Sequence, residues 1–181
     1  MTTLTATDTT ARVWISSFGA YNAGFLIGRW VDAAEAADVT ARQLFEGTPY
    51  RWTDDEELHC FDVEGMLVDR EMSPAEATAQ AELLESVAEH QRLAFRAWAA
   101  SGNHVEGGDG LPSVSDFEER YCGEWSSFDD YARQHGDDMA LLKDVPDDLV
   151  GYFDWAAWTR DLRFDYSVIE AASGVYVFRC Y

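Results

Sequence analysis

Negative charge is the feature that most limits how this chain can fold. Its 181 residues include 34 acidic side chains against 13 basic ones, giving a formal net charge of −21. Repulsion between like charges on this scale destabilises a compact state. The acids are spread evenly, with 17 in residues 1–105 and 17 in residues 106–170. This distribution indicates a charged coat over the whole molecule rather than an acidic tail.

The chain still has ample material for a core, since 47% of its residues are hydrophobic and 14% are aromatic. Such a composition is not that of a disordered chain. The three cysteines, Cys60, Cys122 and Cys180, are far apart and form no C-x-x-C pair. Free thiols in a reducing cytosol are therefore expected. No secretory signal or apolar run of membrane-spanning length is seen, so we expect a cytoplasmic protein with no membrane partner.

Local patterns predict strands and helices without the regular alternation of a parallel sheet, so the expected class is α+β. Residues 19–32 carry three glycines, which are expected to mark turns or close backbone approach. The segments with a strand pattern are 11–18, 57–65 and 174–181, and those with a helical pattern are 33–47 and 73–100.

Helix starts are signalled by small polar residues. Residues 73–76, Ser-Pro-Ala-Glu, fit a capping box with proline in the first turn. Ser113, Ser127 and Asp154 are further predicted caps, and Pro146 marks another helix start. A continuous helix over 73–100 would place one apolar row opposite one acidic row. The apolar row is Leu84, Val87, Gln91, Phe95 and Trp98, and the acidic row is Glu82, Glu85 and Glu89.

Glycines concentrate in residues 101–113, which makes this stretch the best linker in the chain. We expect an acidic surface.

The sequence carries no strong signal for catalysis or metal binding. It has no EF-hand pattern, no G-x-S-x-G, no Walker loop and no G-x-G-x-x-G. His59 and Cys60 are adjacent on an expected strand and so face opposite sides. Two alternatives stay open. An acidic hydrolase could use a carboxylate pair, since so many acids always include a pair at a suitable separation. A halophilic acidic adaptor would also be rich in acids and poor in lysine.

The charge coat itself suggests a further role. B-DNA carries one negative charge per roughly 1.7 Å of axis, so a net charge of −21 corresponds to about 10 base pairs per chain. Acids along helices, at roughly 5–6 Å spacing, approach that density. A protein with a basic DNA groove would accept such a surface in place of DNA. The chain would then bind proteins and not nucleic acid.

Three segments in the same order resemble the ArdA antirestriction family, whose members are carried on mobile DNA. Residues 13–32 are similar to the family's opening, with Tyr-Asn-x-Gly and Gly-x-Trp, and residues 56–65 are similar to its Asp-x-Glu-Gly strand. Residues 141–162 resemble its antirestriction motif, and the final GVYVF also fits. Departures are the polar tail, the glycine-rich stretch, and tryptophan at 155 and 158, where smaller aromatic residues are usual. The motif residues in place are Tyr152, Asp154, Arg160, Asp161 and Leu162.

The resemblance implies three small domains per chain and an elongated, curved homodimer that mimics bent DNA. The domains are an N-terminal α+β domain at 1–70, a central helical domain at 71–110 and a C-terminal α+β domain at 111–181. The homodimer would occupy the DNA groove of Type I restriction–modification enzymes, with no catalysis and no cofactor. It implies that the rings of the motif lie near the subunit contact, although they are equally compatible with an ordinary core. Helix geometry adds five glutamates to the acids carried over as mimic charges. The expected interface residues are Tyr152, Phe153, Trp155 and Trp158. The expected mimic charges are Asp147, Asp148, Asp154 and Asp161 from the resemblance, and Glu82, Glu85, Glu89, Glu118 and Glu119 from helix geometry.

Overall fold

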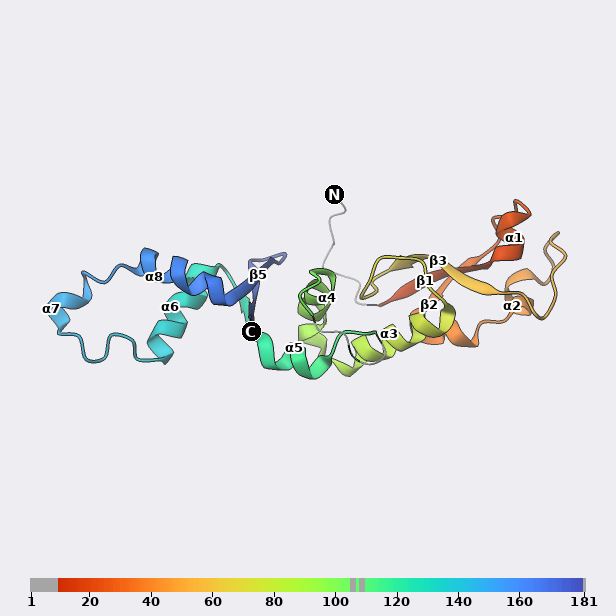
Figure 1. Ribbon diagram of the computed structural model, residues 1–181. Coiled ribbons are helices and arrows are strands. Elements are labelled where there is room, and N and C mark those ends of the chain that lie inside the picture. The colour runs from red at the N-terminus through yellow and green to blue at the C-terminus, as the bar shows by residue number, and fades with distance from the viewer. Residues whose placement is uncertain (1–9, 105–106, 108–109, 181) are drawn as a thin grey trace. The chain divides into compact units, whose positions relative to one another are not determined.

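Two small antiparallel sheets organise the chain in a computed structural model that describes residues 10–104, 107 and 110–180 (Figure 1). Unit 1 comprises residues 1–102 with 106–111, and unit 2 comprises residues 103–105 with 112–181. Both units contain strands and helices, as the α+β prediction requires. The finer division into three domains stays a prediction. Within the described residues, no helix is both long and apolar enough to cross a bilayer.

Unit 1 is built on a sheet with strand order β2-β1-β3, in which both pairs are antiparallel. The central strand, β1, places Val13 and Ile15 in the core, where both are fully buried. Alternation along a strand sends Trp14 to the opposite face. The strand predictions for 11–18 and 57–65 are confirmed, whereas β2, which lies within residues 19–32, was not predicted. The strands are β1 Arg12–Ser17, β2 Arg29–Asp32 and β3 Leu58–Glu64.

One face of this sheet is covered by helix, with α3 lying beneath the strands (Figure 1). Helix α3 packs closely on the short 3-10 segment η1 because fully buried alanines, Ala36 and Ala77 among them, line both elements. Thr78 locks the pair, since its hydroxyl donates to Ala33 O and accepts from Ala37 N, each at 3.0 Å. The helical segments of unit 1 are α1 Phe18–Asn22, η1 Ala33–Asp38, α2 Ala41–Phe45, α3 Pro74–Ser86, η2 Glu89–Gln91 and α4 Arg92–Ala100.

The helical pattern over 33–47 is confirmed by η1 and α2, but the chain is extended between them at Val39, with φ −71° and ψ 130°. Thr40 then begins α2 with a full capping box, in which its hydroxyl and the Gln43 side chain each satisfy the other's backbone N–H. A β-branched residue followed by a strong cap favours a new start over a continued helix. Gly47 follows the end of α2 with φ +79°, the conformation expected of a terminating glycine.

The prediction of one helix over 73–100 is wrong. Helix α3 ends at Ser86, whose hydroxyl bonds back to Leu83 O at 2.6 Å, and Val87 is extended with φ −83° and ψ 140°. Arg92 satisfies carbonyls freed by the break, donating to Val87 O and Glu85 O at 3.1 Å each. Local side-chain bonds thus compete with the helical ladder at this point.

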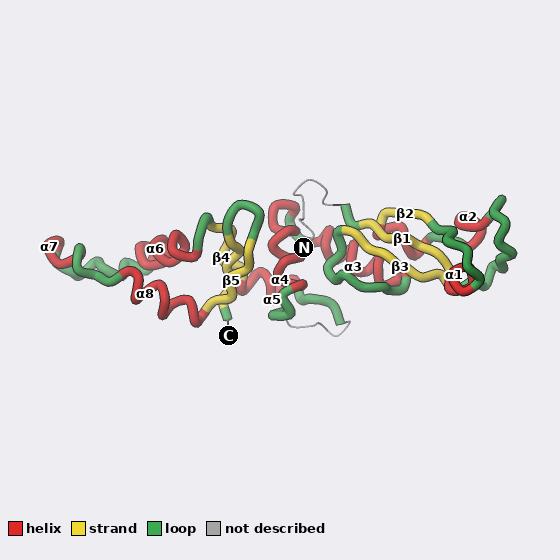
Figure 2. Tube along the Cα trace, turned by 90° about the horizontal axis from the view of Figure 1, so that it is seen from above, coloured by secondary structure: helices red, strands yellow, loops and turns green. Residues whose placement is uncertain are grey.

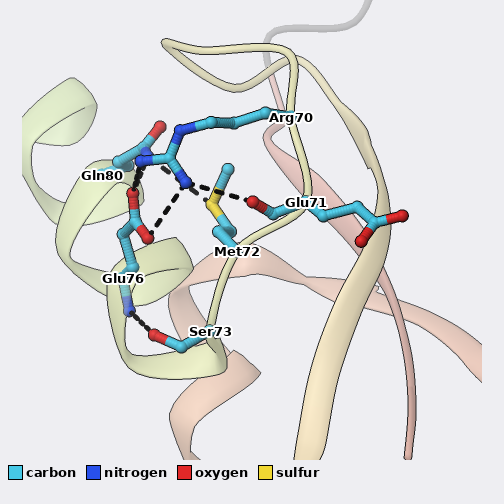
Figure 3. Close-up of polar contacts among 6 residues, drawn as sticks. All are labelled: Arg70, Glu71, Met72, Ser73, Glu76 and Gln80. Carbon is cyan, nitrogen blue, oxygen red and sulfur yellow. Dashed lines mark hydrogen bonds and ion pairs between the residues drawn. The ribbon is translucent and has the colours of Figure 1, made fainter. Parts of the chain in front are cut away.

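The start of α3 confirms half of the predicted capping box (Figure 3). Ser73 Oγ accepts from Glu76 N at 3.2 Å, and Pro74 opens the first turn. The Glu76 carboxylate, however, is engaged by Arg70 and by Gln80 Nε2, the latter at 3.3 Å. Gln80 is itself buried, beside the Met72 sulfur at 3.5 Å. Glu76 therefore ties the preceding loop to the helix.

Unit 2 has a sheet with strand order β4-β6-β5, again antiparallel throughout. The prediction of a closing strand is confirmed by β6, which is central. Residues 175–178 are all buried, so both faces of the strand are covered. Val177 packs towards Phe128 in one cluster, while Phe178 lies against Phe117 and Tyr121. The strands are β4 Tyr121–Trp125, β5 Tyr166–Glu170 and β6 Val175–Arg179, of which β4 and β5 were not anticipated.

The helices of unit 2 begin where their caps were predicted. Ser113, Ser127 and Asp154 each accept the backbone N–H three residues onward, at 3.3, 3.1 and 2.9 Å. The short helix predicted after Pro146 is also present. The helical segments are α5 Val114–Arg120, α6 Phe128–Asp138, α7 Asp147–Val150, α8 Trp155–Leu162 and η3 Arg163–Asp165.

Gly28 provides a test of the packing in unit 1. A Cβ added there would lie 2.6 Å from Trp14 Cζ2, and nearer still to the Ile15 carbonyl oxygen. Because strand backbone does not yield easily, Gly28→Ala is expected to lower the free energy of unfolding by about 1–3 kcal/mol. Urea denaturation followed by circular dichroism measures the change. Gly151→Ala is the control, since nothing lies within 4 Å of its added Cβ; equal stability of the two variants would contradict the packing.

Candidate functional site

The acidic side chains are the candidate functional groups, and nearly all of them face solvent. Among the acids in the described part of the chain, only Glu56, Glu76 and Asp116 are half-buried, and the others are exposed. Each of the three has a partner. Glu56 accepts from Tyr50 OH at 2.9 Å, Glu76 pairs with Arg70, and Asp116 pairs with Arg120 Nε at 2.8 Å. Each half-buried carboxylate thus has a polar partner for at least one of its oxygens.

All nine acids predicted as mimic charges are exposed, but the structure distributes them over several elements. Helices α5, α7 and α8 of unit 2 carry six of them, while α3 and η2 of unit 1 carry three. The six are Glu118, Glu119, Asp147, Asp148, Asp154 and Asp161, and the three are Glu82, Glu85 and Glu89. Exposure is necessary for a charge that contacts a partner, but it does not by itself distinguish these acids from the other exposed ones.

The predicted row of three glutamates on one helix face is wrong. Glu82 and Glu85 share α3 and lie one turn apart. Glu89 belongs to η2, beyond the extended residue Val87, so the α-helical geometry does not relate it to the other two. The apolar row predicted on the other face is nevertheless buried at Leu84 and Phe95. The hydrophobic residues of the predicted row are therefore buried on both sides of the helix break, whereas the three glutamates do not form one row.

Asp147 and Asp148 occupy the first turn of α7, and Asp154 caps α8. A negative charge is favoured at both places because backbone N–H groups at a helix start are unsatisfied and carry partial positive charge. Asp161, near the end of α8, pairs with Arg160 at 3.1 Å. Two of the four acids in the motif, Asp154 and Asp161, therefore have a local structural contact as well as an exposed carboxylate.

The rings of the motif divide into a packed group and an exposed residue. Phe153, Trp155 and Trp158 pack against one another, with centroids 4.9 Å apart for the first two and 5.6 Å for the tryptophans. Gly136 of α6 makes room for them, since an added Cβ would lie 3.1 Å from the Trp155 ring. Tyr152, in contrast, is 85% exposed. The three packed rings therefore hold α8 to α6 within one chain.

The chemistry available to other side chains is limited. Burial, with a smaller contribution from Glu76, raises the pKa of Cys60 to about 12, so its thiol stays protonated near neutral pH. Burial and a hydrogen bond with Tyr166 raise the pKa of Tyr131, and burial raises that of Tyr121 to about 12. Neither phenol is then a base at neutral pH. In the portion described, no three His, Cys, Asp or Glu side chains gather as metal ligands.

Fold and site together define an α+β protein in which nearly all the described acidic side chains are exposed. Comparison with protein families matches residues 13–177 to the family described as Antirestriction protein (ArdA). This match covers nearly the whole chain, and the chain belongs to the ArdA antirestriction family. A comparison with curated proteins gives no match.

Asp154 allows the structural role of a motif acid to be separated from its charge. Its carboxylate accepts from Ala157 N at 2.9 Å. Asp154→Ala removes this cap and is expected to lower the free energy of unfolding by about 1 kcal/mol, whereas Asp154→Asn keeps a good capping residue and should change it little. Chemical denaturation of both variants measures the difference. Identical losses would show that the side chain acts through its charge and not through the cap.

Proposed function

We propose that this protein inhibits Type I restriction–modification enzymes by occupying their DNA-binding groove in place of DNA. It would act in the cytoplasm, without catalysis or a cofactor, so that incoming mobile DNA escapes restriction. Membership of an antirestriction family supports the proposal. The observation that carries the mechanism is the exposure of nearly every described carboxylate. With 34 acids and 13 basic residues in the chain, most of those charges have no basic partner within the same chain.

Physical considerations favour an electrostatic mechanism over catalysis. A catalytic carboxylate pair requires at least one acid with a perturbed environment, usually through burial. The half-buried acids of this structure are instead held by Tyr50, Arg70 and Arg120. A groove that binds DNA phosphates through lysine and arginine is complementary to a surface of uncompensated carboxylates. The affinity would then come from many weak contacts rather than from one site.

Competition with DNA tests this function directly. We expect the protein to displace an oligonucleotide duplex from a purified Type I methyltransferase core, with an affinity that falls steeply as salt is added. Single Asp→Asn changes at 147, 148 and 161 should each weaken displacement by about twofold, and the triple change by about tenfold. Each exposed contact contributes little, so the loss should accumulate.

The matched control replaces the same three aspartates by glutamate, which keeps the charge and changes only its reach. This variant should displace DNA nearly as well as the unmodified protein. Displacement that does not respond to salt, or an equal loss in the amide and glutamate variants, would refute charge mimicry. Loss of all activity on one substitution would favour an acidic enzyme, and unfolding at low salt would favour a halophilic adaptor.

We further propose that the protein acts as a homodimer in which Tyr152 contacts the second copy. The family resemblance implies that the motif lies near a subunit contact, and Tyr152 is 85% exposed in the single chain. An exposed tyrosine in an acidic surface is typical of an interface anchor. Phe153, Trp155 and Trp158 would support the contact from behind, since they already pack together within the chain.

Substitution of Tyr152 distinguishes an interface role from a core role. Tyr152→Ser should weaken self-association by about tenfold, as for an anchor residue, and leave the unfolding free energy of the chain unchanged. Sedimentation equilibrium measures the association and denaturation measures the stability. Leu26→Ser is the control, because Leu26 of unit 1 is 79% exposed and lies outside the motif. If both variants associate like the unmodified protein, the contact lies elsewhere.

A further inference from the structure

The sheet of unit 1 has one face that its helices leave open. Helix α3 lies on the far side of the strands in Figure 2, and no helix of the described chain crosses the near side between the strand ends. A register shift in β3 sets the character of this face. Trp14 is opposite Asp62 and Ile15 is opposite Cys60, so Phe61 is the extra residue of a bulge. Bulges re-aim side chains and are frequent beside functional sites.

Rings gather around Phe61. Its centroid lies 5.3 Å from Tyr21, stacked at 18°, and 5.3 Å from Phe18 and 6.1 Å from Trp14, both edge-on. Trp30 is opposite Trp14 in the ladder and so lies on the same face. Tyr21 is 53% exposed and Trp30 is 38% exposed, so part of each of these two side chains is in contact with solvent. The ring face is defined as Trp14, Phe18, Tyr21, Trp30 and Phe61.

The charges beside these rings are mainly negative. Asp32 and Glu64 are both opposite Arg12 in the ladder, and Asp62 is opposite Trp14, so all three share the face with the rings. All three are exposed. Arg12 itself shows how a cation is held here, since its guanidinium carbon lies 5.7 Å from the Trp30 ring centroid. One arginine from the chain thus occupies a ring flanked by carboxylates, and acids outnumber this cation on the face.

We propose that the ring face binds arginine side chains of a protein partner, with a guanidinium stacked on Tyr21 or Trp30 and paired with Asp32, Asp62 or Glu64. This inference rests on the proposed function, because the partner is then the restriction enzyme. A groove that binds DNA phosphates does so through lysine and arginine side chains. Arginine is favoured over lysine because its planar, weakly hydrated guanidinium stacks on rings and forks to carboxylates. Single-stranded nucleic acid also stacks on rings, but the flanking carboxylates repel its phosphates.

Two peptides of equal length and charge provide the first test. The probes are (Gly-Arg)₄ and (Gly-Lys)₄, both acetylated and amidated, titrated by calorimetry into the full chain. The arginine peptide is expected to bind about two- to fivefold more tightly. The double variant Tyr21→Leu/Trp30→Leu keeps apolar bulk but removes the ring planes, and should bind both peptides alike. Phe164→Leu is the matched control, because Phe164 of unit 2 is 83% exposed, and should keep the preference.

Added salt sharpens the comparison, since it weakens both peptides through screening but leaves the ratio between them, which reports stacking, nearly constant. Equal affinity for the two peptides in the unmodified protein would overturn the proposal. So would a preference that survives the double variant, or tighter binding of single-stranded oligonucleotide than of the arginine peptide. Circular dichroism and a thermal melt establish that each variant is folded before it is titrated.

DNA displacement from the methyltransferase core separates this inference from the proposed function. If the unmodified protein displaces DNA and the double variant is about two- to fivefold weaker, both stand. If the unmodified protein displaces DNA and the double variant does so equally well, the ring face is not part of the contact and the inference fails alone. If the unmodified protein does not displace DNA at all, the proposed function fails, and the inference loses its partner with it.

Discussion

Hydration of the carboxylates limits where this chain can build a core. An ionised carboxylate leaves water only at a large cost in free energy unless a partner replaces the lost hydration. The structure meets this limit with two small sheets, each covered by short helices, rather than with one large core. Small units have more surface for their volume. The chain can therefore expose nearly all the acids of its described part and still bury Val13, Ile15 and Val177.

A small core must be closely packed to be stable, and in this chain aromatic rings and glycines make close packing possible. Aromatic side chains bury a large area per residue and hold their position with few rotatable bonds. Trp155 and Trp158 lie against Gly136, and Trp14 lies against Gly28, so in each unit a missing side chain admits a ring. This is why acids and rings alternate along the chain. Most of the rings are buried or pack against one another, although Tyr152 and Phe164 are exposed, and nearly all the described acids remain in water.

The parts of the fold that the sequence predicted are those fixed by local chemistry. Caps at Ser113, Ser127 and Asp154 and the buried run of β6 follow from side-chain bonds and hydrophobicity within a few residues.

The errors arose where the sequence pattern did not reveal competing local interactions. Val39 and Val87 interrupt helices whose apolar periodicity continues, because Thr40 and Ser86 supply alternative hydrogen bonds. Strands β4 and β5 were missed because each is stabilised by pairing with β6. Strand β4 is also distant from β6 in the sequence. Exposure of the nine acids followed from composition, whereas their grouping required the tertiary structure.

The separation of rings from charges also bears on how a mimic is recognised. Charge alone attracts any basic groove, and the attraction weakens as salt is added. Stacking on an exposed ring depends on contact geometry and is much less sensitive to salt. A surface that combines the two can draw in a basic partner at long range and then discriminate among partners at short range. In unit 1 the bulge at Phe61 brings a ring and a carboxylate together on one sheet face, because Phe61 then lies beside Asp62. The same side chains that stabilise a small sheet then become available to select a partner.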